Sequence, residues 1–144
     1  MIQKYNKSPI SLREGEVFIE GVKVLDGIKC EVKFTPDVWS GRQLRDQTES
    51  SRWLGYAIAG TITRRRSTPW LKDIISRYAK TKRTPEFTIQ GIMNDENSDY
   101  YSEHGSIKTT VVGCILTGDL NLINLDSGGT VVEDAIAFKA RDIV

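Results

Sequence analysis

The chain has 144 residues, 39% of them hydrophobic and 27% charged, which is the composition of one folded domain and excludes a disordered chain. Its 20 Lys and Arg nearly balance 19 Asp and Glu, and the formal net charge of +1 argues against a dedicated nucleic-acid binder. Two cysteines, Cys30 and Cys114, are too few for a disulfide framework, and we expect both to be small residues buried or half-buried within strands.

The first residues of the chain contain no apolar run, so the sequence predicts no signal peptide. No apolar stretch approaches the roughly 18 residues needed to cross a bilayer. We therefore expect a protein that is made in the cytoplasm and does not insert into a membrane as a monomer.

The amino-terminal third predicts a flexible arm followed by strands. Residues 1–14 are polar and lack a periodic pattern, which is typical of a loose arm. A short strand is predicted over 16–20, with a turn at Gly21, and a second run over 22–34 is broken at Asp26-Gly27. Beyond that break apolar and charged residues alternate, so one face of the strand is expected to be buried.

Residues 36–52 have neither a strand period nor a helix period, and the sequence predicts one long loop there. Loops of this length are uncommon in a compact domain, where connections usually have about 4–6 residues. Trp39 and Leu44 are apolar residues within it that have no local partner. The segment is therefore expected to be functional, to be disordered in the free chain, or to be a poorly formed hairpin.

A strand and then a helix are predicted in the middle of the chain. Residues 53–64 alternate between large apolar residues and a face of Ala and Thr, on which something is expected to pack closely. A helix is predicted over 69–80, with Ser67 or Thr68 as its cap and Pro69 in its first turn. Its apolar stripe is expected to face the core: Leu71, Ile74, Ile75 and Tyr78.

The remaining sequence predicts further strands over 87–93, 107–116 and 131–140, and one that begins at 120–123. Residues 94–105 are expected to form an acidic loop. The fold class is therefore α+β: a mainly antiparallel β-sandwich or barrel of about six or seven strands with one α-helix. We predict a single domain over 1–144.

Catalytic motifs are missing from the sequence. The single histidine, His104, falls in a predicted loop, and the Gly-x-Ser-x-Gly, phosphate-binding and Cys-x-x-Cys patterns do not occur. We therefore predict a protein that is not an enzyme and that needs no cofactor. The enzyme hypothesis that stays open uses the loop carboxylates of Asp95, Asp99 and Glu103, and it requires their pKa values to be raised in a cleft.

The acidic loop begins like a calcium loop, because Asp95, Asn97 and Asp99 stand at alternating ligand positions. Tyr100 then replaces the glycine of the sharp turn, and Ser106 replaces the bidentate glutamate. We predict a solvated hairpin loop and no metal site.

Basic residues cluster in two places, at Arg64, Arg65 and Arg66 and at the end of the predicted helix. These residues can be solvated, or they can form salt bridges to acidic loops of a neighbouring subunit, and the pattern favours neither hypothesis. Phosphate binding ranks behind both, because the aromatic residues of a single-strand binder are not interleaved with them.

Several segments, in their order along the chain, resemble those of phage tail tube proteins of contractile tails, in particular the type found in defective-prophage and R-type bacteriocin particles of Gram-positive bacteria. The segments are Arg13–Gly21, a polar loop with Gly41-Arg42, the small-residue strand Gly55–Thr63, a helix that ends in Tyr78-Ala79-Lys80, and Pro85–Asp95. The last of these is the most specific, since a Pro-x-Phe-Thr-Ile-Gln strand runs there into an acidic loop.

The resemblance implies hexameric rings that stack into a hollow tube inside a contractile sheath. The implied partners are further copies of the chain, the sheath protein, a tape-measure protein or DNA in the lumen, and baseplate and tail-terminator proteins. Contacts between subunits or rings are predicted for eight residues: Trp39, Arg42, Leu44, Arg45, Arg64, Arg65, Arg66 and Trp70. The alternative is a monomeric small β-barrel that binds a ligand or a peptide.

Overall fold

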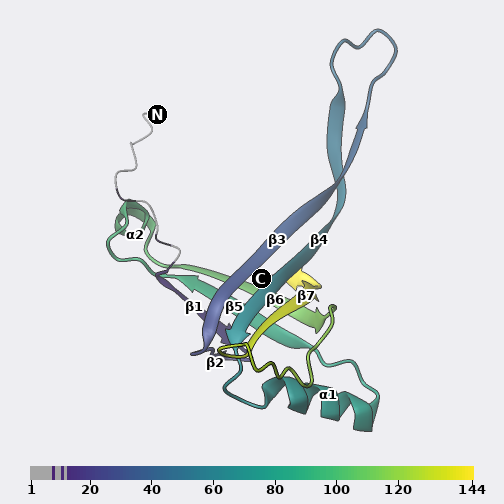
Figure 1. Ribbon diagram of the computed structural model, residues 1–144. Helices are drawn as coiled ribbons and strands as arrows, with labels where there is room; N and C mark the ends of the chain where they lie inside the picture. The colour runs from purple at the N-terminus through teal and green to yellow at the C-terminus, as the bar shows by residue number, and fades with distance from the viewer. Residues whose placement is uncertain (1–7, 9–10, 12) are drawn as a thin grey trace.

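The structure, a computed structural model, describes residues 8, 11 and 13–144, so most of the predicted arm over 1–14 lies outside the described residues. Eight strands and two helices are present in that part of the chain (Figure 1). In chain order they are β1 (Gly15–Ile19), β2 (Val22–Lys23), β3 (Gly27–Gly41), β4 (Ser50–Arg65), α1 (Trp70–Thr81), β5 (Phe87–Met93), α2 (Asp99–His104), β6 (Ile107–Leu116), β7 (Glu133–Ala140) and β8 (Asp142–Ile143).

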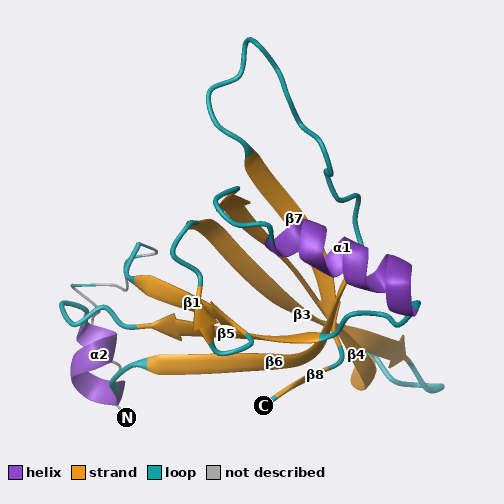
Figure 2. Cartoon of the chain, turned by 90° about the horizontal axis from the view of Figure 1, so that it is seen from below, coloured by secondary structure: helices purple, strands orange, loops and turns teal. Residues whose placement is uncertain are grey.

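The strands form an antiparallel sheet in the order β2-β1-β5-β6-β7-β4-β3, and β8 adds to β6. Strand β6 changes partners along its length: it pairs with β5 and β8 up to Cys114 and with β7 at Ile115 and Leu116. Gly113 lies at this change with φ +65, and a Cβ there would come within 2.8 Å of Cβ of Arg141. A glycine therefore permits the turn by which one sheet becomes two groups of strands, seen from below in Figure 2. The predicted fold class is confirmed.

One hydrophobic core lies between these two groups of strands and beneath α1. Strands β4 and β7 contribute one side and strands β1, β5 and β6 the other. The buried members are Ile19, Ile58, Ile62, Leu71, Phe87, Ile89, Val111, Cys114, Ile136 and Phe138. Cys114 is fully buried and Cys30 half-buried, and burial raises the pKa of both thiols, so neither has the properties of an activated nucleophile.

Helix α1 lies within one residue of its predicted position. Leu71 and Ile74 are buried as expected, whereas Tyr78 is half-exposed beneath the ammonium group of Lys82. No side chain caps the amino terminus of the helix, so the predicted cap is wrong. The Ser67 hydroxyl donates its hydrogen bond to the carboxylate of Asp26.

The prediction of one long loop over 36–52 is wrong, because residues 36–41 and 50–52 belong to the paired strands β3 and β4. Strands β3 and β4 stay in register from Cys30↔Ile62 out to Gly41↔Ser50, with a bulge between Asp37 and Val38. Pro36 is tolerated because β3 is an edge strand, where a missing backbone N–H breaks no ladder. The turn is therefore confined to residues 42–49.

Two smaller predictions also fail. The strand expected from 120–123 is absent, since the carbonyl oxygens of Asn121 and Leu122 accept hydrogen bonds from Arg66 and residues 117–132 contain no strand. The acidic loop contains the short helix α2, whose first turn is capped when the hydroxyl of Ser98 accepts from the N–H of Tyr101.

Gly60→Ala is expected to destabilise the fold more than Gly55→Ala does. At Gly60 a Cβ would lie 2.3 Å from the carbonyl oxygen of Glu31 and 2.8 Å from Cζ of Phe138, whereas at Gly55 nothing lies within 4 Å. Overpacking of this kind costs about 1–3 kcal/mol or more. In urea unfolding of dilute protein, the midpoint of Gly60→Ala should lie below that of the wild type, and the midpoint of Gly55→Ala should match it. Equal midpoints for the two variants would contradict the packing described here.

Candidate assembly interface

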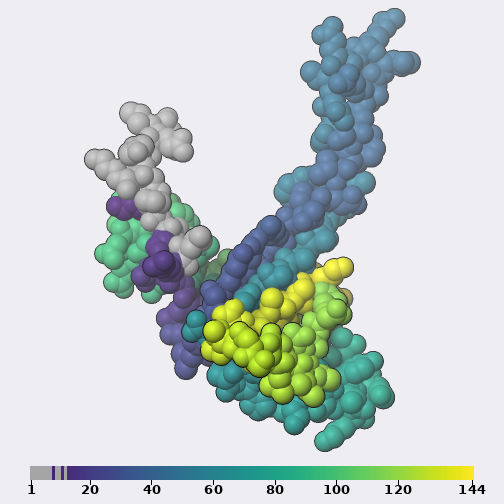
Figure 3. Space-filling view, viewed as in Figure 1, coloured from purple at the N-terminus to yellow at the C-terminus, as the bar shows by residue number. Residues whose placement is uncertain are grey.

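Strands β3 and β4 extend beyond the rest of the sheet as a two-stranded arm. Strand β7 pairs with β4 only over Ile58–Arg65, so residues 35–57 have no other strand partner in the part of the chain that the structure describes. Figures 1 and 3 show this arm, residues 35–57, rising away from the body. A two-stranded ribbon alone is marginally stable in water, which indicates that the arm is built to rest on something else.

The arm has a free edge along β3. This strand of 15 residues is paired with β4 on one side, and no other described strand pairs with it. Every second residue along the free edge therefore presents an unpaired N–H and C=O to solvent. An edge of this length is a template for the addition of a strand from another chain.

One face of the arm carries a half-exposed aromatic cluster of Phe34, Trp53 and Tyr56. The Phe34 ring stacks on Tyr56 at 5.1 Å and meets Trp53 at 5.6 Å between ring centroids. The Tyr56 hydroxyl donates a 3.0 Å hydrogen bond to Asp142, and this carboxylate raises the pKa of Tyr56. Trp53 remains 64% exposed, so the cluster is preformed but uncovered.

The end of the arm carries four of the predicted contact residues, with Trp39 near the end of β3 and Arg42, Leu44 and Arg45 in the turn. Leu44 is 97% exposed and Trp39 half-exposed. The turn has internal order, because the carboxylate of Asp46 accepts from the N–H of Gln43 and the N–H of Asp46 donates back to the Gln43 carbonyl. Contacts of these four residues with another copy remain a prediction.

Arg64 and Trp70, by contrast, are used inside the chain. Nη2 of Arg64 lies 2.9 Å from Oδ1 of Asp26 as an ion pair and donates a hydrogen bond to Oδ2 at 3.2 Å. Its guanidinium lies over the Trp70 ring, which meets Phe87 edge-on. Both side chains therefore have partners within the chain, and their contacts with another copy remain a prediction.

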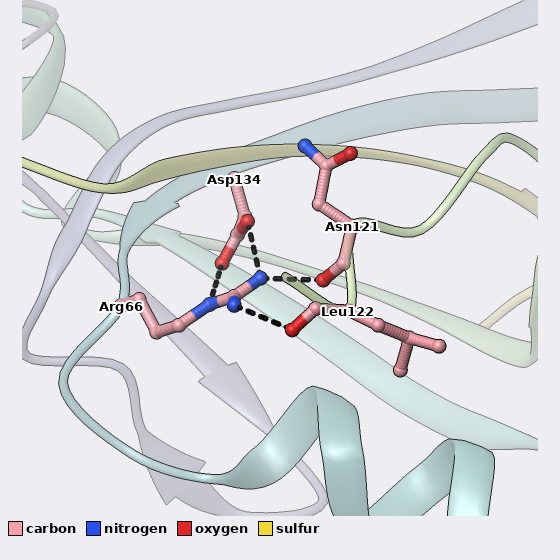
Figure 4. A network of polar contacts seen from close by, with 4 residues as sticks. All are labelled: Arg66, Asn121, Leu122 and Asp134. Atoms are coloured by element: carbon pink, nitrogen blue, oxygen red, sulfur yellow. Dashed lines mark hydrogen bonds and ion pairs between the residues drawn. The ribbon is translucent and has the colours of Figure 1, made fainter. Parts of the chain in front are cut away.

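Arg66 is also committed within the chain, as Figure 4 shows. Its guanidinium binds both carboxylate oxygens of Asp134, at 3.0 and 2.9 Å, and donates to the carbonyl oxygens of Asn121 at 2.6 Å and Leu122 at 3.3 Å. Arg65, between the two, stays exposed with Glu133 at 3.9 Å. The three arginines therefore do not form one basic patch, and Arg65 is the most exposed of them.

The acidic loop is held together by its own carboxylates. Asp95 is 8% exposed and accepts hydrogen bonds from the backbone N–H groups of Ser11 and Asn97, while Asp99 accepts from the N–H of Ser8. These bonds attach Ser8 and Ser11 to the loop and to α2. Among the described residues no group of acidic, histidine or cysteine side chains has the arrangement of a metal site.

Asp26→Asn is expected to destabilise the fold in a pH-dependent way. Burial alone would raise the pKa of Asp26, but hydrogen bonds from Ser67 and Arg64 and the Arg64 charge hold it below its ordinary 3.8. A carboxyl whose pKa is lower in the folded state adds stability above about pH 4, and that stability is lost as the pH falls through the folded pKa. Breaking a buried pair costs about 3 kcal/mol.

Urea unfolding at pH 7 and at pH 3 measures this effect, with the exposed Asp119→Asn as the control. At pH 7 the free energy of unfolding of the wild type should exceed that of Asp26→Asn. The difference between the two free energies should be smaller at pH 3. A difference that is constant with pH would contradict a role for the Asp26 charge.

The aromatic cluster was missed by sequence analysis. The alternation that places Phe34 and Tyr56 on one face was visible, but it was interpreted as a buried face. What distinguishes the two is length: β4 begins at Ser50, whereas β7 pairs with it only from Ile58. Trp53 joins the same face only because of the bulge at Asp37 and Val38.

Comparisons with known proteins place this geometry in a class. The fold is that of solved components of extracellular contractile injection systems. The structure titled sheath/tube terminator of the PVC system in its extended state matches with TM-score 0.69 and 10% identity over 96% of each chain. The anti-feeding prophage cap, a tube terminating cap, matches with TM-score 0.72 and 12% identity over 100% of this chain and 93% of the other. The PVC sheath-tube complex matches with TM-score 0.68, 10% identity and coverage of 96% and 91%.

The chain belongs to the phage tail tube protein family, whose model matches residues 5–143. The search of curated protein sequences found no match. No helix among the described residues is long and apolar enough to span a membrane. Membership of this family places the chain among structural proteins.

Proposed function

We propose that the chain is the subunit of the inner tube of a contractile, phage-tail-like particle. Copies join side by side into hexameric rings, and the rings stack into a hollow tube that a sheath drives through the envelope of a target cell. The observation that carries the proposal is the arm, with its free β3 edge and its uncovered aromatic cluster. Both features are incomplete in one copy, and an identical copy can complete them.

The family match and the likeness to sheath-tube, terminator and cap structures support this proposal. The proposed partners are further copies of the chain, a sheath protein outside the tube, a tape-measure protein or DNA inside it, and baseplate and terminator proteins at its ends. The protein is then assembled in the cytoplasm of a bacterial host before it becomes part of the particle. A Gram-positive origin and the bacteriocin assignment stay predictions.

The same proposal describes the domain organisation of the chain. One tail tube domain spans 1–144, the segment before β1 contacts the body through Asp95 and Asp99, and the arm reaches the next copy. The alternative, a monomeric ligand-binding barrel, requires a closed sheet, whereas the described sheet ends in the open edge of β3. A non-enzymatic role is part of the proposal.

Negative-stain electron microscopy of the purified protein at several concentrations tests the proposed function. Uniform rings or hollow fibres that lengthen as the concentration rises are the expected result. Particles that remain monomeric at the highest soluble concentration would overturn the proposal in favour of the binding module.

A further inference from the structure

A second apolar surface lies in residues 117–132, which we call the apolar loop. The loop contains no strand, and four of its hydrophobic side chains are largely exposed: Leu122, Ile123, Leu125 and Val131. Ile123 is 81% and Leu125 88% exposed. In Figure 3 this segment, in lime, lies on the front of the lower body, far from the end of the arm.

The apolar loop is held in one shape although it lacks regular structure. At its start, Arg66 binds the carbonyl oxygens of Asn121 and Leu122 and is itself fixed by Asp134 (Figure 4). Near its end, the Asp126 carboxylate accepts from the N–H of Gly128, and its carbonyl accepts from Gly129. The exposed side chains between these two points are therefore preorganised, which lowers the entropic cost of binding.

The position of the loop relative to the arm is set by strand β4. The turn of the arm immediately precedes Ser50, the first residue of β4, whereas the loop leads into Glu133, which pairs with Arg65, the last. The two surfaces thus lie at opposite ends of one 16-residue strand, a span of about 50 Å. A copy cannot bring its own turn to its own loop, but a copy displaced along this direction can.

The charges of the two surfaces permit the contact. The turn carries Arg42 and Arg45 against Asp46 and Glu49 and is neutral, and Arg52 beyond it makes the end of the arm, residues 39–53, slightly positive. The apolar loop carries Asp119 and Asp126 and no Lys or Arg, so it is net negative. Each surface also has exposed hydrophobic side chains, with Trp39 and Leu44 on the arm.

We propose that the turn of the arm, around Leu44, docks on the apolar loop of a second copy in the next ring. This inference rests on the proposed tube function and identifies the surface that receives the arm. The contact is heterologous, so one end of every ring offers turns and the other end offers loops, and stacking continues without closing. Arg66 is then a positioning residue, which shapes the loop without touching the partner.

Disulfide crosslinking tests the contact. Leu44→Cys is combined with Ile123→Cys in a Cys30→Ser background, where the remaining Cys114 is fully buried. The matched pair combines Leu44→Cys with Met93→Cys, since Met93 is also half-exposed but lies at the end of β5. Oxidation of assembled protein should give a ladder of covalent oligomers with the first pair and not with the second. A ladder with the Met93 pair, covalent dimers from Leu44→Cys alone, or no ladder from the first pair in assembled protein would overturn the proposal.

A mixing experiment covers the case in which the cysteine variants do not assemble. Leu44→Asp places a charge in the turn that docks, and Ile123→Asp places a charge in the loop that receives it. Rings of either variant alone should therefore not stack. Mixed together, they should form stacks of two rings and no longer ones, because each ring keeps one working end. Single rings in the mixture would contradict the proposal. Wild-type tubes in the same experiment separate this failure from failure of the tube function itself.

Discussion

A chain with aspartate in place of Trp53 is expected to fold but to form no rings. Trp53 is largely exposed in the single copy, so the substitution removes no core contact. In the assembly it places a charge in the aromatic cluster of Phe34, Trp53 and Tyr56, which a neighbouring copy is proposed to cover. Loss of a central aromatic contact costs about 2 kcal/mol or more, equivalent to roughly 30-fold in the concentration needed for each contact.

The matched control is Thr35→Asp, which adds the same charge to the opposite face of the same arm. Thr35 pairs with Ala57, and both side chains point away from the aromatic cluster. Analytical ultracentrifugation across a concentration series should show monomers for Trp53→Asp and assemblies for Thr35→Asp. Urea unfolding of the dilute proteins should give similar stabilities. Assembly of Trp53→Asp at wild-type concentrations would show that the cluster is not a contact between copies.

Trp39→Ala combined with Leu44→Ala is expected to leave rings intact and to abolish long tubes. Both residues are at the far end of the arm, beyond the aromatic cluster, and neither belongs to the core. Their removal should cost about 2 kcal/mol or more per subunit at the contact between rings, repeated around each ring. Electron microscopy should therefore show short stacks or single rings in place of fibres.

The control for this variant is Gln47→Ala with Thr48→Ala, in the same turn and equally exposed. These polar residues contribute little apolar area, so tube length should match that of the wild type. If the Trp39 and Leu44 variant yields tubes of unchanged length and amount, the end of the arm is not the stacking element.

The fold could be predicted from the sequence where local pattern and tertiary partner agree. The alternation in β5 and β6 and the stripe of α1 each reflect one buried face, and the structure buries most of those faces. The same expectation is wrong for β3, whose alternating residues Ile28, Val32 and Phe34 are half-exposed because nothing in the single copy covers them. The turn at Gly21 was predictable for a local reason, because Glu20 and Gly21 both have positive φ in a two-residue hairpin loop.

The arm could not be predicted, because its strands follow no simple alternation. The bulge at Asp37 and Val38 shifts the register, Pro36 imitates a strand ending, and the outer pairs are polar, such as Ser40 with Ser51. Such residues occur in loops as often as in exposed ribbons. Only the pairing itself distinguishes the two.

The internal roles of Arg64 and Arg66 were hidden for a different reason. A run of three arginines indicates a basic surface, yet alternate side chains of a strand point to opposite faces. The partners of the two arginines, Asp26 and Asp134, are distant in sequence and become neighbours only through the sheet. Trp39 and Leu44, at the end of the arm, could be singled out as contact residues from the sequence, because apolar side chains without a local partner require a partner elsewhere.

Hydrogen–deuterium exchange of β3 tests most directly whether another copy pairs with its free edge. Peptides that cover residues 27–41 would be compared in dilute monomer and in assembled protein. Strong protection of this strand on assembly is expected, since its outward N–H groups gain acceptors, while the core strand β5 should change little. Equal exchange of β3 in the two states, in a sample that contains tubes, would contradict it.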